Sequence, residues 1–492
     1  MQTEASQMQQ LTLRSLLAAG RRTLFGATHG FADVGDYESF RNRVPVRDYE
    51  HFYPYIDKIK RGEPDITWPG TIHWMAKSSG TTDAQSKFIP VTTDSLNTAQ
   101  YRGAQDCLAV YVNEHPDTRI FSGKCLTLGG SKKISTLAEH CQTGDLSAIM
   151  IDNAPKWSNF FKTPSKEIAL LEKWEEKLTQ ITQYTAHQKV TSLAGVPSWL
   201  LILLQYIMKE KGVQNIQQVW PDLELFIHGG INFEPYREQY ERICPLGLNL
   251  LETYNASEGF FALQTQGQPG MQLMMDYGIF YEFVPLSDVG NDYPEGAVTI
   301  ADVKTDVDYA IVITANNGLW RYMIGDTVRF ISTNPHRILI SGRTKLYINT
   351  FGEELMIGNA ESAMHQACEA TGAVVREYTA APVYMKQDAH GCHEWLVEFE
   401  KMPQDIDAFA KLLDENLQKV NSDYQAKRYK DITLDPLRLT VARQGLFFDF
   451  MKANGKLGGQ NKIPRLKNDR SLIDSLLKMN TEAGSTLYIE TT

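Results

Sequence analysis

Several short segments of this sequence carry small, hydroxyl-bearing or charged residues in patterns suited to binding an anionic ligand. The first is Lys77-Ser78-Ser79-Gly80-Thr81-Thr82, followed closely by Lys87. Its small residues let backbone N–H groups approach an anion, its hydroxyl groups add donors, and Lys87 adds charge. No Gly-Lys-Ser/Thr stands at the spacing of a Walker A loop. The segment is therefore interpreted as either a phosphate-binding loop or a polar surface turn.

Two further segments follow strands that the sequence predicts. Residues 254–258 read Tyr-Asn-Ala-Ser-Glu and come after a strand expected at 248–251. A loop at the carboxyl end of such a strand is a natural ligand position, and the Glu258 carboxylate is a hard oxygen donor suited to Mg²⁺. His228-Gly229-Gly230 also follows an expected strand, where the glycines would let a flat ring lie on the backbone. Ordinary strand-end turns are the alternative in both cases.

Three later segments add a carboxylate and basic residues. Gly325-Asp326 could present its carboxylate to both hydroxyls of a ribose, or form a plain hairpin edge. Gly342-Arg343-Thr344-Lys345 is a short basic stretch that is alternatively a simple linker. The Gly-rich basic stretch 455–465 could swing a lysine over a phosphate, or be a surface loop.

The elements that would position these segments change in type along the chain. Strands expected at 223–227 and 248–251, with a helix near 235–243 between them, indicate an α/β domain. After residue 275 the chain predicts a β-rich section, with alternating runs at 278–284, 297–303, 308–314, 319–324, 327–331 and 337–341.

Beyond residue 346 the expected order is helix, strand, strand and helix, the last near 405–420. The fold class predicted is therefore α/β, with a large N-terminal domain over 1–341 and a smaller α+β domain over 347–492. The boundary between the two domains is placed at 342–346.

The composition excludes several classes of partner. The 492 residues carry 49 Lys and Arg against 59 Asp and Glu, a net charge of −10, which disfavours nucleic acid and anionic membranes. No apolar run approaches the roughly 20 residues of a membrane helix, and no secretory signal is recognised. The six scattered cysteines are typical of reduced thiols, so a cytoplasmic protein is predicted. A zinc site near His390, Cys392 and His393 lacks a second ligand pair.

In this order, the segments resemble the motif series of the adenylate-forming superfamily of acyl-CoA synthetases, luciferases and peptide-synthetase adenylation domains. Within it, the chain resembles the auxin-responsive acyl-acid amidosynthetase family of plants and its bacterial relatives. The similar stretches are Ser78–Thr82 with Lys87–Pro90, Gly195–Trp199, Tyr254–Glu258, Gly318–Tyr322 with Gly325-Asp326, and Gln460–Arg465, after a lead-in at Val44–Tyr49. The resemblance spans roughly residues 40–465, and the combination is specific although single motifs are not.

The resemblance implies a role for each matching residue. It places the ATP phosphates at Ser78, Ser79, Gly80, Thr81 and Thr82, with Lys87 nearby. It places the adenine against Gly229, Gly230, Tyr254, Asn255, Ala256 and Ser257, Mg²⁺ on Glu258, and the ribose hydroxyls on Asp326 beside Arg343. It makes Lys345 the hinge residue and Lys462 the lysine that reaches the α-phosphate, with Lys456 as the fallback.

Two positions match the family less closely. Met323 stands where the family has an arginine, so the role of that arginine is absent or has moved to Arg321. Arg102 stands about where plant members bind the acid, and a solvated helix arginine is the alternative.

The implied activity is that of an ATP-dependent acyl-acid amidosynthetase. A carboxylate attacks the α-phosphate and releases pyrophosphate, and an amine, expected to come from an amino acid, then displaces AMP. Mg²⁺ and a lysine would stabilise the charge on the phosphoryl oxygens, and a rotating small domain would serve both steps. An acyl-CoA ligase and a catalytically silent nucleotide-binding relative are the alternatives. Small-molecule acid and amino acid substrates and a monomer are expected, without nucleic-acid or membrane partners.

Overall fold

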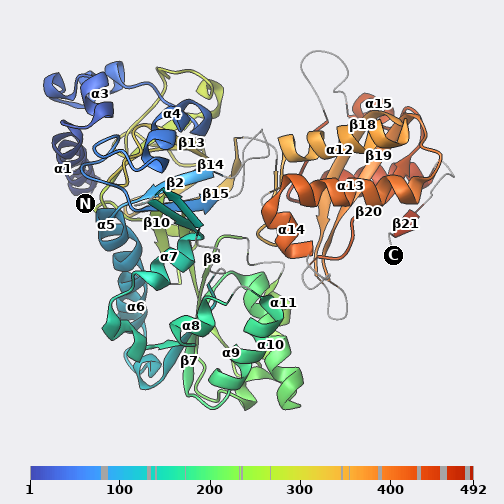
Figure 1. The fold of residues 1–492 in the computed structure, drawn as a ribbon, viewed down its shortest axis with the longest axis horizontal. Helices are drawn as coiled ribbons and strands as arrows, with labels where there is room; N and C mark the ends of the chain where they lie inside the picture. The colour runs from blue at the N-terminus through green and yellow to red at the C-terminus, as the bar shows by residue number, and fades with distance from the viewer. Residues whose placement is uncertain are drawn as a thin grey trace. The chain divides into compact units, whose positions relative to one another are not determined.

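The computed structural model describes residues 2–78, 87–129, 135–138, 141–171, 173–231, 233, 236–265, 267–344, 347–353, 355–385, 390–428, 434–454, 463–482 and 488–490. They form two compact units (Figure 1). The first is built from the chain up to residue 78 and from residues 87–230 and 240–344. The second is built from residues 231–239 and the chain beyond 344.

An 11-stranded sheet forms the centre of the first unit. Strand β9 (Asn249–Ala256) is where its pairing changes, because β9 is parallel to β8 and antiparallel to β10. On the parallel side lie β8 (Leu225–Gly229), β7 (Val190–Gly195), β3 (Lys124–Thr127) and β6 (Lys162–Thr163). On the antiparallel side lie β10 (Gly259–Gln264), β11 (Met271–Leu273), β15 (His336–Arg343), β14 (Tyr322–Thr333), β13 (Asp308–Ala315) and β12 (Ile279–Pro285).

A smaller sheet and a set of helices complete the first unit. The small sheet has the order β2 (Lys87–Val91), β1 (Trp74–Ser78), β5 (Cys141–Gly144) and β4 (Ser135–Ala138). The helices are α1 (Gln2–Gly20), α2 (Leu24–Thr28), α3 (Tyr37–Arg43), α4 (Tyr49–Lys60), α5 (Thr93–Ser95), a π-helix (Leu96–Tyr101), α6 (Arg102–Glu114), α7 (Leu146–Asp152), α8 (Lys166–Ala169), α9 (Trp174–Thr185) and α10 (Pro197–Lys211). Helix α11 (Arg237–Ile243) spans the division between the two units.

Helix α10 shows how local sequence and burial agree. Pro197 occupies its first turn, where the missing N–H is not needed, and Gly212 ends it in the left-handed conformation at φ 64°. Its leucines are fully buried, so this apolar stretch is a core helix. Among the described residues, no helix is long and apolar enough to cross a membrane.

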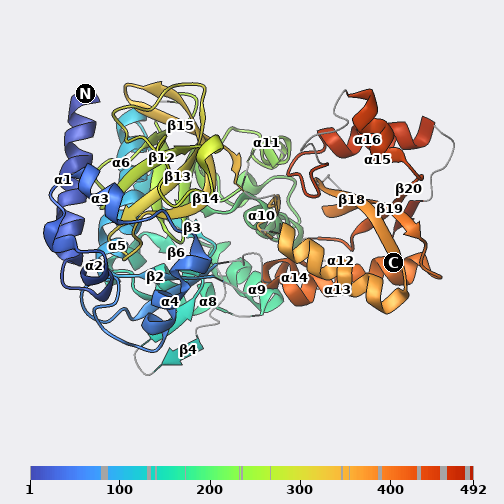
Figure 2. The same cartoon turned by 90° about the horizontal axis from the view of Figure 1, so that it is seen from above.

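The second unit is a four-stranded sheet with helices on both faces. The strand order is β18 (Val374–Val383), β19 (Cys392–Lys401), β20 (Arg438–Ala442) and β21 (Tyr488–Glu490). Helices α12 (Ile357–Thr371), α13 (Ile406–Val420) and α14 (Ser422–Arg428) lie on one side of it, and α15 (Leu446–Ala453) and α16 (Ser471–Glu482) on the other (Figure 2). Two short strands, β16 (Tyr347–Ile348) and β17 (Leu355–Met356), precede α12.

The structure corrects three strand predictions. The runs 319–324 and 327–331 belong to one strand, β14, which begins only at Tyr322. The run 297–303 is not a strand: Val298 exchanges backbone hydrogen bonds with Phe283, and the chain then turns, with the N–H of Asp302 donating to the carbonyl of Thr299. Strand β9 is longer than predicted because β10 continues pairing as far as Ala256, so residues 254–256 lie in the strand and not in a loop.

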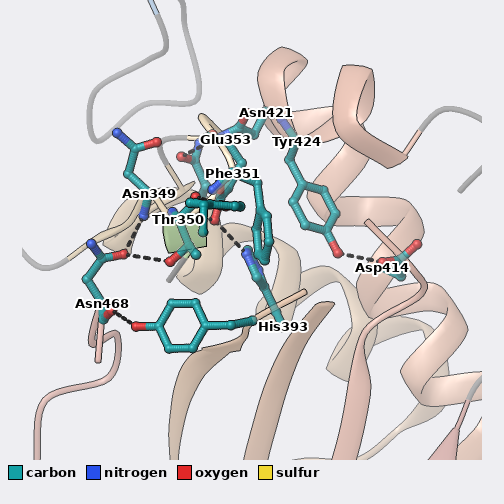
Figure 3. A network of polar contacts seen from close by, with 12 residues as sticks. Asn349, Thr350, Phe351, Glu353, His393, Asp414, Asn421, Tyr424 and Asn468 are labelled. Atoms are coloured by element: carbon teal, nitrogen blue, oxygen red, sulfur yellow. Dashed lines mark hydrogen bonds and ion pairs between the residues drawn. The ribbon is translucent and has the colours of Figure 1, made fainter. Parts of the chain in front are cut away.

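A buried polar network fixes the first loop of the second unit (Figure 3). The carboxylate of Glu353 accepts the N–H groups of Thr350 and Phe351 at 3.2 and 2.6 Å and lies 2.9 Å from Nε2 of His393. Oδ1 of Asn468 accepts the N–H of Asn349 at 2.8 Å. Because Glu353 and His393 are fully buried, these bonds hold the chain firmly a few residues after the division at 344.

Candidate active site

The carboxyl ends of β8 and β9 lie side by side because these strands are parallel, with Gly229 opposite Thr253. A Cβ on Gly229 would stand 2.4 Å from the carbonyl oxygen of Thr253, so only glycine fits there. Gly230 has φ +83°, a conformation that favours glycine. The predicted ring-binding segments at 229–230 and 254–257 are thus brought to one edge of the sheet.

A second group of predicted residues converges on the carboxylate of Asp326. Asp326 and Arg343 are cross-strand neighbours on β14 and β15, and Nε of Arg343 donates to Oδ1 at 2.7 Å. The hydroxyl of Tyr254, from the end of β9, donates to Oδ2 at 2.6 Å. Burial, and then the charge of Asp326, raise the pKa of Tyr254 well above its usual value, so the phenol stays a neutral donor. Each carboxylate oxygen is thereby oriented and retains a lone pair for a further donor.

Glu258 lies at the turn between β9 and β10 and is 7% exposed. Its backbone carbonyl accepts Nδ2 of Asn317 at 2.9 Å, which fixes the turn. Burial, and then the charge of Glu258, raise the pKa of Tyr322 well above its usual value. Among the described residues, the buried hydroxyl of Tyr322 and the side-chain oxygen of Asn255 have no hydrogen-bond partner. The region beside Glu258 therefore has polar groups available to a ligand.

A small cavity of about 10 Å³ adjoins this turn. Its lining comes from β2, α5, the π-helix, α7, the β9–β10 turn, the start of β12 and the turn after β13: Val91, Ser95, Ala99, Gln100, Leu146, Ser257, Glu258, Gly259, Ile279, Asn316 and Asn317. Gln100 lies in the π-helix and lines the cavity, and π-helical turns are frequent at functional sites. Sequence reasoning placed only Ser257 and Glu258 in the site, because no motif marks the others.

The strands β1 and β2 bring the two ends of the hydroxyl-rich segment together. Ser78 pairs with Lys87, and Nζ of Lys87 lies 6.0 Å from the centre of the Tyr49 ring. Ser79, Gly80, Thr81 and Thr82 lie outside the described residues, as do Lys345, Lys456 and Lys462.

Arg102 begins α6 and is held by acidic groups of the protein. Its guanidinium binds Asp276 at 2.6 Å, lies 3.7 Å from Asp106 and stacks over the ring of Tyr277. Arg102 does not line the cavity. Its proposed contact with the acid stays a prediction.

Arg321 has no place in the site, which corrects the suggestion that it substitutes for the missing family arginine. It is fully buried, binds both carboxylate oxygens of Glu282, and donates to the carbonyls of Arg41 and Val44. Met323 packs against a small apolar cluster that includes Val46.

Comparison with known families decides the classification. A family model described as the GH3 family N-terminal domain matches residues 1–247, the central domain of that family matches 272–343, and its C-terminal domain matches 358–471. The chain belongs to the GH3 family. The predicted family is thereby confirmed.

Named GH3 proteins are distant in sequence but match nearly end to end. The probable indole-3-acetic acid-amido synthetase GH3.1 of Arabidopsis thaliana is 21% identical, over 97% of this chain and 91% of its own length. The 4-substituted benzoates-glutamate ligase GH3.12 of the same plant is 23% identical, over 89% of each chain.

The solved structure of the AtGH3.15 acyl acid amido synthetase in complex with 2,4-DB matches with a TM-score of 0.62 at 19% identity, over 98% of this chain and 95% of that one. The predicted α/β adenylate-forming fold is confirmed. As a GH3 protein the chain is a ligase that forms carbon–nitrogen bonds, and adenylate-forming ligases use ATP.

Proposed function

We propose that this GH3 chain activates a small carboxylic acid with ATP and transfers the acyl group to the amine of an amino acid. The carboxylate oxygen bonds to the α-phosphorus and pyrophosphate leaves. The amine nitrogen then bonds to the acyl carbon and AMP leaves. The observation that carries the proposal is the buried Asp326 carboxylate, oriented by Tyr254 and Arg343 at the sheet edge that holds the predicted nucleotide segments.

Different residues around that edge bind the ribose, the adenine and the phosphates of the nucleotide. Asp326 accepts the ribose hydroxyls, and Arg343 holds its carboxylate in place through a charge-assisted hydrogen bond. The adenine lies along Gly229, Gly230, Tyr254, Asn255, Ala256 and Ser257. The phosphates lie against Ser78, Ser79, Gly80, Thr81 and Thr82. Lys87, which pairs with Ser78, adds a positive charge to this segment.

Glu258 fits a Mg²⁺ ligand. Mg²⁺ is usually bound by one or two protein carboxylates together with substrate phosphates. Glu258 is a nearly buried residue at the edge of the sheet where the nucleotide is proposed to bind. When bound, the ion would supply positive charge to the phosphoryl oxygens. The role of Glu258 is to hold that charge next to the phosphate-binding segment.

We propose that residues 1–341 and 347–492 act as two domains about a hinge at 342–346 centred on Lys345. Support comes from the division of the compact units after residue 344. Before Lys345, the N–H of Thr344 donates to the carbonyl of Gly325 at 2.8 Å. After Lys345, the network around Glu353 fixes residues 349–353. Monomeric state and cytoplasmic location stay predictions from the sequence.

An exchange assay tests the proposal. Purified protein is incubated with ATP, labelled pyrophosphate and a library of aromatic, indole and aliphatic acids, and label entering ATP is measured. We expect exchange with at least one acid, because adenylation is reversible. The active acid is then supplied with either an amino-acid mixture or coenzyme A. Amide as the main product supports the proposal, thioester would establish the acyl-CoA ligase alternative, and absence of exchange with every acid would establish a silent relative.

Replacing Tyr254 with phenylalanine should weaken ATP binding about tenfold. The substitution removes one donor from a buried carboxylate, and a hydrogen bond to a charged group contributes about 1.5–3 kcal/mol. Calorimetric titration of ATP measures the change. Tyr281→Phe is the matched control, because that buried hydroxyl donates to the neutral carbonyl of Met274. An unchanged ATP affinity in Tyr254→Phe would contradict the role given to Asp326.

Replacing Arg102 with methionine tests its contact with the acid. If Arg102 binds the acid carboxylate, the KM for the acid in the exchange assay rises about tenfold, the order expected for a lost charge-assisted bond, while the KM for ATP is unchanged. An unchanged KM for the acid would assign Arg102 to its ion pair with Asp276 alone.

A further inference from the structure

The cavity beside Ser257 and Glu258 is lined by two side chains that each carry a buried hydrogen-bond acceptor without a donor. Gln100 and Asn316 both line it, and they are 3% and 7% exposed. Among the described residues, Oε1 of Gln100 and Oδ1 of Asn316 have no hydrogen-bond partner. Buried polar atoms in native proteins almost always have a partner, so two such atoms at one cavity point to a ligand.

The hydrogen-bond partners of each side chain determine whether its amide nitrogen or its amide oxygen is the atom without a partner. Nε2 of Gln100 lies 3.3 Å from the carbonyl oxygen of Ala256, and a carbonyl can only accept, so nitrogen must face it. Nδ2 of Asn316 lies 2.6 Å from Oγ1 of Thr98. The hydroxyl proton of Thr98 already goes to the carbonyl of Asp94 at 2.8 Å, so its oxygen accepts from Asn316. In both cases the unpartnered atom is therefore oxygen, an acceptor.

The remaining walls of the cavity limit what can supply the donor. Val91, Ala99, Leu146 and Ile279 are apolar. Two polar neighbours in the lining donate elsewhere, the hydroxyl of Ser95 to the carbonyl of Thr92 and Nδ2 of Asn317 to the carbonyl of Glu258. The volume of about 10 Å³ is the space of a single water-sized group. A hydroxyl or an amino group has that size, whereas a methyl group of similar size would leave both acceptors unpaired.

We propose that the acid substrate carries a hydroxyl or amino group on its acyl part, and that this group donates to the side-chain oxygens of Gln100 and Asn316. The inference rests on the proposed function, because it takes the acid to lie next to the Ser257-Glu258 turn, where the nucleotide and Mg²⁺ are placed. It goes further by stating the chemical class of the acid: one with a hydrogen-bond donor away from its carboxylate.

Matched pairs of acids test the proposal in the wild-type protein. Exchange of pyrophosphate into ATP is measured without any amino acid, so only the acid is tested and not the amine acceptor. Each pair differs by one group: hydroxy, amino and unsubstituted members of aliphatic, benzoic, arylacetic and cinnamic acids. We expect the active series to favour a hydroxy or amino acid over its unsubstituted partner at least tenfold in kcat/KM.

Variants then assign the preference to the cavity. Gln100→Leu and Asn316→Leu should lower kcat/KM for the donor-bearing acid more than for the unsubstituted acid, and so reduce the preference to less than threefold. Gln217→Leu is the matched control, because that buried glutamine is satisfied at both ends, by the carbonyl of Gly247 and the N–H of Leu246. It should lose stability and keep the preference.

The outcomes separate the two proposals. Exchange in which unsubstituted acids are equal or better in every series would overturn this inference and leave the proposed function intact. The same would follow if the two cavity variants kept the full preference. Absence of exchange with all acids would overturn the proposed function and this inference with it.

Discussion

Replacing Lys462 with alanine should lower the rate of acyl-adenylate formation about 100- to 1,000-fold, the usual cost of removing one donor that stabilises transition-state charge. ATP affinity should change less than about twofold, since the lysine is proposed to act only when the small domain closes. The segment directly after Lys462 is anchored: the hydroxyl of Thr379 donates to the carbonyl of Pro464 at 2.7 Å, and the N–H of Ala380 to that of Arg465 at 2.9 Å. The chain at Pro464 and Arg465 is thus fixed to β18.

Single-turnover formation of pyrophosphate measures the chemical step, and calorimetry measures ATP binding. Lys456→Ala is the matched control from the same Gly-rich stretch, and it should leave the rate within about threefold, as expected for a lysine that makes no transition-state contact. A large loss in Lys456→Ala and none in Lys462→Ala would make Lys456 the closing lysine. Loss of ATP affinity with an unchanged chemical step would contradict the closing model altogether.

Replacing Arg321 with methionine should reduce the free energy of unfolding by about 3–5 kcal/mol, because it leaves the Glu282 carboxylate buried without its charge partner. Both side chains are only 1% exposed. The hydroxyl of Tyr37, 2.9 Å from Glu282, is a single neutral donor and cannot replace the guanidinium. Denaturant unfolding followed by tryptophan fluorescence measures the loss.

An exposed pair provides the control for Arg321. Arg329 binds Asp308 in the same two-bond geometry, but these side chains are 45% and 30% exposed, so Arg329→Met should cost at most about 1 kcal/mol. Adding Glu282→Gln to Arg321→Met should recover part of the stability, since the buried charge is then gone. A loss in Arg321→Met no larger than in Arg329→Met would show that the buried pair is not a main support of the fold.

Much of the candidate site could be predicted because short sequence motifs indicate which residue types stand close together along the chain. The glycines at 229–230, the Tyr-x-x-Ser-Glu segment and the Gly-Asp pair are short patterns whose order is specific to the family. The pairing of Asp326 with Arg343 also follows from a local hairpin, since β14 and β15 are consecutive antiparallel strands. The strand–helix alternation predicted the α/β class for the same reason.

The sequence did not distinguish Arg321 from a ligand-binding arginine. Its partner Glu282 lies 39 residues earlier in the chain, and the pairing arises because β12 and β14 flank β13 in the sheet. The run 297–303 failed as a strand for a different reason. Val298 pairs with Phe283 on β12, the end strand of the sheet, but the chain turns at 299–302 and the pairing does not continue.

By itself, the sequence determined the family and the α/β fold class and predicted the candidate site residues, because these depend on residue type and order along the chain. The tertiary structure alone decided which residues far apart in the chain meet. Tyr254 reaches Asp326 across 72 residues of chain, and Gln100 and Asn316 come to one cavity from elements more than 200 residues apart. Such contacts are set by how the sheet and its helices pack, and no short pattern records that packing.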